Sequence, residues 1–201
     1  MNFKSIGQVV FPEPQDICIN MMPFVMGDIN SIPEEFRHYY PLIEACDLSP
    51  NQMGKVGYLS ITESQVVPGT SHRRGGAHVE KQPITNWGNG GWGRGNSRNG
   101  VEDGLYIAST VDNSCRVWDQ HIFFPGWGGC CEHLRSILKN GIDLKANELA
   151  WITDSCPHES LPLADTVYRQ WFRLVTHKVD LWFADKSTEN RLGVKAPCMV
   201  V

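Results

Sequence analysis

The sequence has no long apolar run, no excess of positive charge and no CxxC pair of cysteines. A membrane-spanning helix needs about 20 consecutive apolar residues, so we expect no membrane partner. The formal net charge of −4 gives no electrostatic reason to expect nucleic acid as a partner. The opening stretch MNFKSIGQVVFPEPQD lacks an apolar core, so we expect no secretory signal.

The seven cysteines do not follow the closely repeated spacing of disulfide scaffolds or zinc ribbons. Cys130 and Cys131 are adjacent, an arrangement that suits neither an ordinary bridge nor a four-ligand site. We therefore expect reduced thiols, as in a cytoplasmic protein.

Length and composition favour one globular domain over residues 1–201. Hydrophobic residues make up 41% and charged residues 20% of the chain, which is ordinary for a folded protein. There is no internal repeat and no linker. We expect an N-terminal flanking segment with a short helix over 1–55, a core over 56–178, and an irregular C-terminal tail over 179–201.

Strand-like texture dominates from residue 56 onward. Alternating or β-branched stretches are found at residues 57–67, 77–84, 104–110, 114–124, 148–154 and 167–183. This pattern predicts a mainly β fold, either a barrel or a two-sheet jelly roll with a few flanking helices.

Two short helices are expected beside these strands. Ser31 and Glu34 have the spacing of a capping box, so a helix should start there, and Pro41 should kink or end it. Residues 131–141 carry apolar side chains at helical spacing and end in Asn140-Gly141, a plausible stop.

Residues 85–104 are rich in glycine and include Trp87 and Trp92. Glycine at this density disfavours regular structure, and a loop this long inside a domain is often functional. It could be a lid whose tryptophans contact a substrate, or an irregular surface loop with the tryptophans packed beneath it.

The stretch GGAHVEKQP, residues 75–83, raises the question of a metal site. A strand sends residues i and i+2 to one face, so His78 and Glu80 can point at the same place. Two histidines and one carboxylate form a typical facial set for a divalent metal. A third ligand would come from another strand, and His158 ends one. Arg169 follows eleven residues later and could grip a carboxylate.

In this order, the residues resemble the 2-oxoglutarate- and Fe(II)-dependent dioxygenases of the prolyl-hydroxylase type. The specific part is ELAWITDSCPHESLPLADTVYRQWFRL, and the likeness extends over residues 56–178. The resemblance implies a double-stranded β-helix, also called a jelly roll. It also implies iron held by His78, Glu80 and His158, and 2-oxoglutarate bound through Arg169, with no catalytic residue beyond the metal site.

The chain departs from the family pattern at two positions. Glu80 stands where aspartate is usual, and Trp171 stands where a small hydroxyl residue often follows the arginine. Arg173 shares the strand face of Arg169, so either could bind the cosubstrate carboxylate. Tyr58 could supply a hydroxyl to that carboxylate or could be a core residue.

Arg74 and Arg116 are the remaining candidates for substrate contact, although a solvated turn and a structural ion pair would also explain them. The resemblance implies hydroxylation of a small molecule or of a side chain. Two alternatives stay open: a cupin-like metal enzyme that does not use 2-oxoglutarate, and a non-catalytic jelly-roll module that binds carbohydrate through exposed tryptophans.

Overall fold

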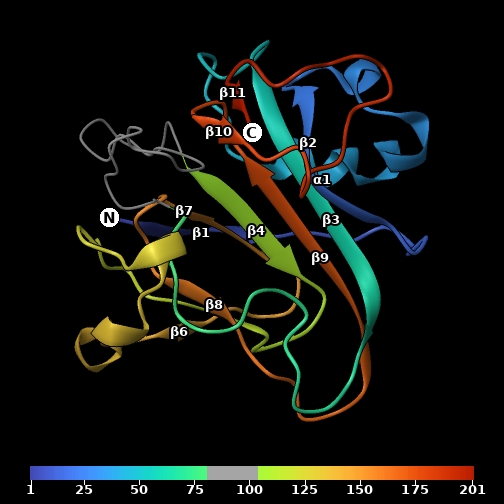
Figure 1. The fold of residues 1–201 in the computed structure, drawn as a ribbon. Helices are drawn as coiled ribbons and strands as arrows, with labels where there is room; N and C mark the ends of the chain where they lie inside the picture. Colours follow the sequence, from blue (N-terminus) through green and yellow to red (C-terminus); the bar gives the residue numbers. More distant parts are fainter. Residues whose placement is uncertain (81–103) are drawn as a thin grey trace.

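The computed structural model describes residues 1–80 and 104–201, and these form a mainly β protein (Figure 1). Six strands make a large antiparallel sheet in the order β1-β7-β4-β9-β3-β2. Their bounds are Phe3–Gln8 (β1), Cys18–Val25 (β2), Val56–Val66 (β3), Leu105–Ser109 (β4), Glu148–Ile152 (β7) and Val167–Val175 (β9).

A second, smaller sheet is ordered β6-β5-β8. Its strands are Cys115–Val117 (β5), Ile142–Asp143 (β6) and His158–Ser160 (β8). His78 extends this sheet by single bridges to His158 on one side and Cys130 on the other. From β3 onward the chain therefore passes alternately through the large and the small sheet.

Strand β9 lies between β3 and β4 in the large sheet, and its residues separate two environments (Figure 1). Because side chains alternate along a strand, Phe172 and Leu174 join one apolar cluster with the helical segment. Arg169, Trp171 and Arg173 point to the opposite face, toward the small sheet. The strand expected at 167–183 is thus present in its first half, as β9. One face of β9 carries Arg169 and Arg173 into the space between the two sheets.

The helices are shorter than the sequence suggests. Residues 29–45 form two 3-10 turns, η1 (Ile29–Ser31) and η2 (Glu34–Tyr39), and one α-helix, α1 (Tyr40–Ala45). Pro41 sits in the first turn of α1, where its missing N–H costs nothing. The segment that begins at Glu34 ends at Tyr39, so the interruption expected at Pro41 lies directly beside it. The expected helix at 131–141 is a 3-10 segment, η4 (Glu132–Ile137), preceded by η3 (Trp127–Gly129).

The flanking segments take more part in the fold than expected. The N-terminal strands β1 and β2 occupy the two edges of the large sheet. In the C-terminal segment, β10 (Leu181–Trp182) pairs with β11 (Met199–Val200). Asn190 anchors the tail by donating hydrogen bonds to the carbonyls of Pro23 and Ser31.

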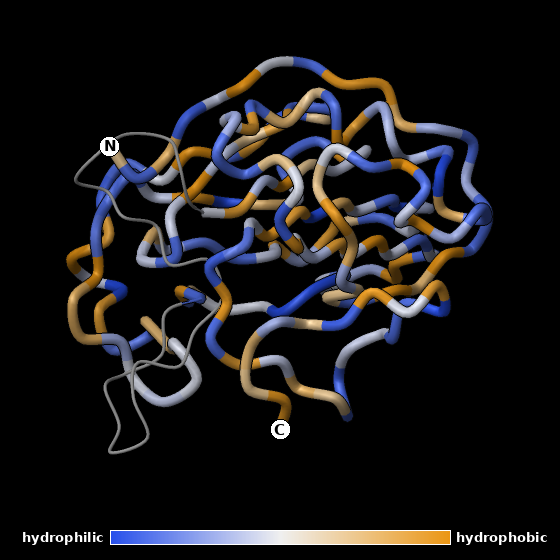
Figure 2. The backbone as a smooth tube through the Cα atoms, turned by 90° about the horizontal axis from the view of Figure 1, so that it is seen from above, coloured by the Kyte–Doolittle hydropathy of each residue, from blue (hydrophilic) through white to orange (hydrophobic). Residues whose placement is uncertain are grey.

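Hydrophobic and hydrophilic residues interchange along the backbone (Figure 2). In the described ranges, none of the helices has the length and apolar character needed to cross a bilayer. The strands expected at 77–84 and 114–124 are reduced to a bridge at His78 and to β5, and residues 81–84 lie outside the described residues.

Candidate metal centre

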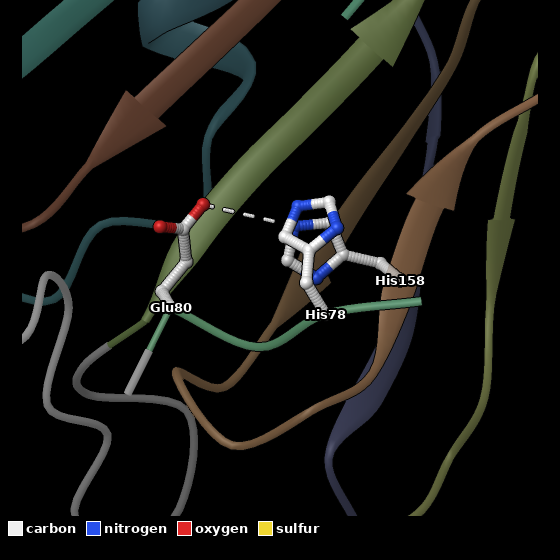
Figure 3. Close-up of side chains that lie close together, drawn as sticks. All are labelled: His78, Glu80 and His158. Carbon is white, nitrogen blue, oxygen red and sulfur yellow. Dashed lines mark ion pairs between the residues drawn. The ribbon is translucent and has the colours of Figure 1, made fainter. Parts of the chain in front are cut away.

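His78, Glu80 and His158 form a cluster between the sheets, and their potential ligand atoms all lie within 4.8 Å of one another (Figure 3). The backbone N–H of His78 donates to the carbonyl of His158 at 3.0 Å, and the reverse bond measures 2.9 Å. The two imidazoles therefore stand side by side, with ring centroids 4.5 Å apart. Ordinary sheet pairing holds them there.

Local hydrogen bonds fix which nitrogen each histidine presents. Nδ1 of His78 lies 2.7 Å from the carbonyl oxygen of Gly76, and Nδ1 of His158 lies 3.1 Å from that of Cys156. A carbonyl oxygen only accepts, so each Nδ1 carries a proton, and in the neutral imidazole Nε2 then keeps its lone pair. Partners of this kind orient the ligating nitrogens in metal sites.

Two of the candidate ligands, His78 and Glu80, are in the protonation states that a metal needs. Burial, with His158 close by, lowers the pKa of His78 to about 3, so this imidazole is neutral at pH 7. Burial alone would raise the pKa of Glu80, but the Arg173 guanidinium and the imidazole of His158 outweigh it. They hold that pKa well below its usual range.

The geometry of the cluster fits a divalent metal ion. Oε1 of Glu80 lies 3.7 Å from Nε2 of His158. Bonds of about 2.0–2.2 Å, as zinc makes to imidazole nitrogen or carboxylate oxygen, hold neighbouring ligand atoms about 3 Å apart in a facial set. The three side chains would therefore draw together by roughly 1 Å or more on binding a metal, from the present spread of up to 4.8 Å. Two imidazoles and one carboxylate are the donor set typical of non-haem Fe(II).

Arg169 is fully buried on β9, on the same cavity as the cluster. Its Nε donates to the Ser109 hydroxyl at 2.8 Å and its Nη1 to the Ser160 hydroxyl at 3.0 Å. Its Nη2 is buried and has no hydrogen-bond partner in the described part of the chain. A buried cation with only neutral partners and one unused donor suits an anionic ligand.

Arg173 lies four residues further along the same strand, and its hydrogen-bond partners differ from those of Arg169. Its Nη1 donates to Oε1 of Glu80 at 3.0 Å, and both side chains are largely buried. Its Nη2 lies 3.2 Å from Oδ1 of Asn20. This contact with a candidate metal ligand distinguishes Arg173 from Arg169.

A cavity of about 230 Å³ connects these groups. Since about 10–15 Å³ of such volume holds one water, the cavity has room for a small molecule. Trp171 and Ile107 provide apolar wall, while four arginines and a lysine provide positive charge.

The other candidate residues lie elsewhere or at the rim. The Tyr58 hydroxyl lies 3.5 Å from the thiol of Cys198, away from the cavity. Arg116 forms a two-bond ion pair with Asp143, also away from it. Arg74 is exposed, lines the cavity and donates to the carbonyl of Gly128. The glycine-rich segment 85–104, with Trp87 and Trp92, for which a lid and a surface loop were the two expectations, falls outside the described residues except for Gly104.

Several residues at the cavity were not identified from the sequence. Ser109 and Ser160, which hold Arg169, come from β4 and β8 and give no local signal. Asn20 is the exception: it is a polar residue inside the apolar run CINMMPFV, which marks a strand position facing a polar interior. In the sequence, Arg73 stands out only as part of a basic turn.

Comparison of the chain with protein-family models, with curated proteins and with solved structures gives no match.

Proposed function

We propose that this protein is an Fe(II)- and 2-oxoglutarate-dependent oxygenase that acts on a small molecule or a side chain. The observation that carries the proposal is a single cavity that joins a two-histidine, one-carboxylate cluster to a buried arginine with an unused donor. His78, Glu80 and His158 would hold iron, and Arg169 would bind the distal carboxylate of 2-oxoglutarate.

The path of the chain supports a double-stranded β-helix. Strands β3, β4, β7 and β9 lie in the large sheet, in the order β7-β4-β9-β3. The segments that alternate with them, His78, β5 with β6, and β8, lie in the small sheet. In that fold the metal site lies between the two sheets, which is where the cluster lies here.

The iron would supply the coupling of 2-oxoglutarate decarboxylation to substrate oxidation by dioxygen. The chain's own part is to bind and orient. Ser109 and Ser160 hold the Arg169 guanidinium in one orientation, which leaves Nη2 for a carboxylate oxygen. A charge-assisted hydrogen bond of this kind is among the stronger polar contacts in proteins.

Arg173 keeps Glu80 ionised and turned toward the histidines through its 3.0 Å hydrogen bond. Because Glu80 has a longer side chain than aspartate, it has an additional torsion angle to fix. The contact with Arg173 supplies that restraint, which accounts for how the longer carboxylate can serve in this position.

The test is anaerobic titration of purified protein with Fe(II) in the presence of 2-oxoglutarate, followed by the weak visible charge-transfer absorption of the chelate. Succinate formation on exposure to air is the second readout. His158→Ala removes one ligand and should abolish both signals. His133→Ala is the matched control, because His133 is exposed and lies outside the cluster.

Absorption and succinate that need both iron and 2-oxoglutarate would support the proposal. Iron binding without either signal would overturn the use of 2-oxoglutarate and favour a cupin-like enzyme. No metal binding would leave a non-catalytic jelly-roll module that binds ligands such as carbohydrate.

A further inference from the structure

The cavity carries more positive charge than the cosubstrate requires. Its cationic lining residues are Arg73, Arg74, Arg169, Arg173 and Lys186, and its carboxylates are Glu80 and Glu159. Both carboxylates are already engaged. Glu80 accepts from Arg173, while Glu159 forms two bonds, 2.8 and 2.7 Å, with Arg135. A positive cavity in a chain of net charge −4 indicates anionic ligands.

After Arg169, Arg73 is the cavity cation whose positive charge is offset least by neighbouring groups. Its guanidinium donates to the Thr62 hydroxyl at 3.1 Å and to Oδ1 of Asn20 at 3.4 Å, and it lies 4.4 Å from the ring centre of Trp171. Burial, with Arg173 adding to the effect, lowers the pKa of Arg73 to about 10. Within residues 1–80 and 104–201 no carboxylate forms an ion pair with it.

Asn20 links Arg73, Arg173 and the backbone of Lys186. Its Oδ1 accepts from both Arg73 and Arg173, and its Nδ2 donates to the carbonyl of Lys186 at 2.7 Å. Lys186 is exposed at the cavity edge, and its ammonium group lies 5.4 Å from the centre of the Phe183 ring. Among the residues that the structure describes, no carboxylate pairs with this group. Since Arg173 also contacts Glu80, the group around Asn20 lies directly beside the metal ligands.

We propose that Arg73 and Lys186 form an oxyanion subsite, separate from Arg169, that binds a carboxylate or phosphate group of the substrate. The substrate is therefore an acidic small molecule. This inference rests on the proposed function in one respect, namely that Arg169 is taken by 2-oxoglutarate.

The positions of the guanidinium donors around the cavity support two bound anions and not one. A guanidinium that is removed from water and has only neutral partners costs free energy that an anion would offset. Arg169 is fully buried and Arg73 is half-buried, and the hydrogen-bond partners of both are neutral. Arg73 stacks on Trp171, which follows Arg169 on the same face of β9. Arg173 is neutralised by Glu80, so it does not need the second anion.

The experiment measures binding of two probes, inorganic phosphate and malonate, by calorimetry. The protein is loaded with Zn(II), which prevents turnover, and with saturating 2-oxoglutarate. At least one probe should bind under these conditions, and the tighter probe identifies the acid group. Arg73→Gln should weaken binding roughly tenfold or more, since a charge-assisted hydrogen bond is lost. Lys186→Gln should weaken it less.

Two variants serve as controls. Lys145→Gln removes an exposed lysine whose partner is Asp112, away from the cavity, and should leave probe binding unchanged. Arg169→Met should weaken binding of 2-oxoglutarate. Without 2-oxoglutarate, the variant should lose any probe binding at Arg169 and keep the probe binding that depends on Arg73. Lys186→Gln keeps the test valid if Arg73→Gln fails to fold, because Lys186 is exposed.

Probes that compete with 2-oxoglutarate and depend on Arg169 would overturn the second subsite, as would the absence of any probe binding. Failure of the proposed function has a different signature. In that case 2-oxoglutarate would not bind with metal, while the probes would still bind through Arg73.

Discussion

His78 and His158 exchange backbone hydrogen bonds with each other, although 80 positions separate them in the chain. The ring nitrogen that each would offer to a metal is set by a further bond from Nδ1 to a nearby carbonyl. Neither restraint involves a metal ion. The site is therefore preorganised by the sheet.

Metal removal should accordingly leave the fold intact. Treatment with a chelator should lower the melting temperature only by the mass-action contribution of the bound metal, and far-ultraviolet circular dichroism should not change. Thermal unfolding with and without chelator checks this. Loss of secondary structure in chelator would show instead that the metal organises the fold, as in zinc fingers.

The ion pair between Glu80 and Arg173 should be strongly coupled. Because the two side chains are only 13% and 7% exposed, replacing either one leaves the other charged and buried. Glu80→Gln and Arg173→Met should each cost about 3–5 kcal/mol of stability.

The double variant should cost clearly less than the sum of the two single changes, because it removes both charges. Urea denaturation of the four proteins in chelator gives the coupling energy. Simple additivity would argue that the pair contributes nothing beyond its separate packing.

His72 should make the protein less stable in mild acid. Burial, with Arg169 and Arg73 adding to it, lowers its pKa from 6.5 to about 4, and its Nε2 lies 2.8 Å from the Ser64 hydroxyl. Between these values the unfolded chain binds a proton that the folded chain does not. The contribution of His72 is therefore full above pH 6.5 and is lost as the pH falls toward 4.

Comparing urea midpoints of the wild type and His72→Gln from pH 7 to pH 4 isolates this effect. The variant should show a shallower decline across that window. Parallel curves would mean that His72 is not held neutral in the folded protein.

Arg169→Met should separate stability from binding. The change removes a fully buried charge that has only hydroxyl partners, so the free energy of unfolding should stay the same or rise. The affinity for 2-oxoglutarate, measured with Zn(II) by calorimetry, should fall on the order of a hundredfold. Unchanged affinity would assign the cosubstrate carboxylate to another residue. Arg116→Met, at an ion pair outside the cavity, is the matched control.

Much of the candidate centre could be predicted from short-range patterns. Residues i and i+2 share a strand face, so His78 with Glu80, and Arg169 with Trp171 and Arg173, were expected to point together. The structure brings these two groups to one cavity. The strands β4, β7 and β9 were recognisable for the same reason, since each alternates or is apolar over its whole length.

Features that depend on distant partners could not be predicted. Phe3 pairs with Ile152, and Cys18 pairs with Thr62, so strands β1 and β2 exist because they find the edges of an existing sheet.

The sequence by itself determined the kinds of candidate ligand, their order along the chain and the mainly β character, because these follow from side-chain chemistry and the two-residue period of a strand. Only the tertiary structure decided which arginine contacts Glu80 and which retains an unused donor. It also decided that Tyr58 turns toward Cys198. Those outcomes depend on how two sheets pack, and packing is set by contacts among residues far apart in the chain.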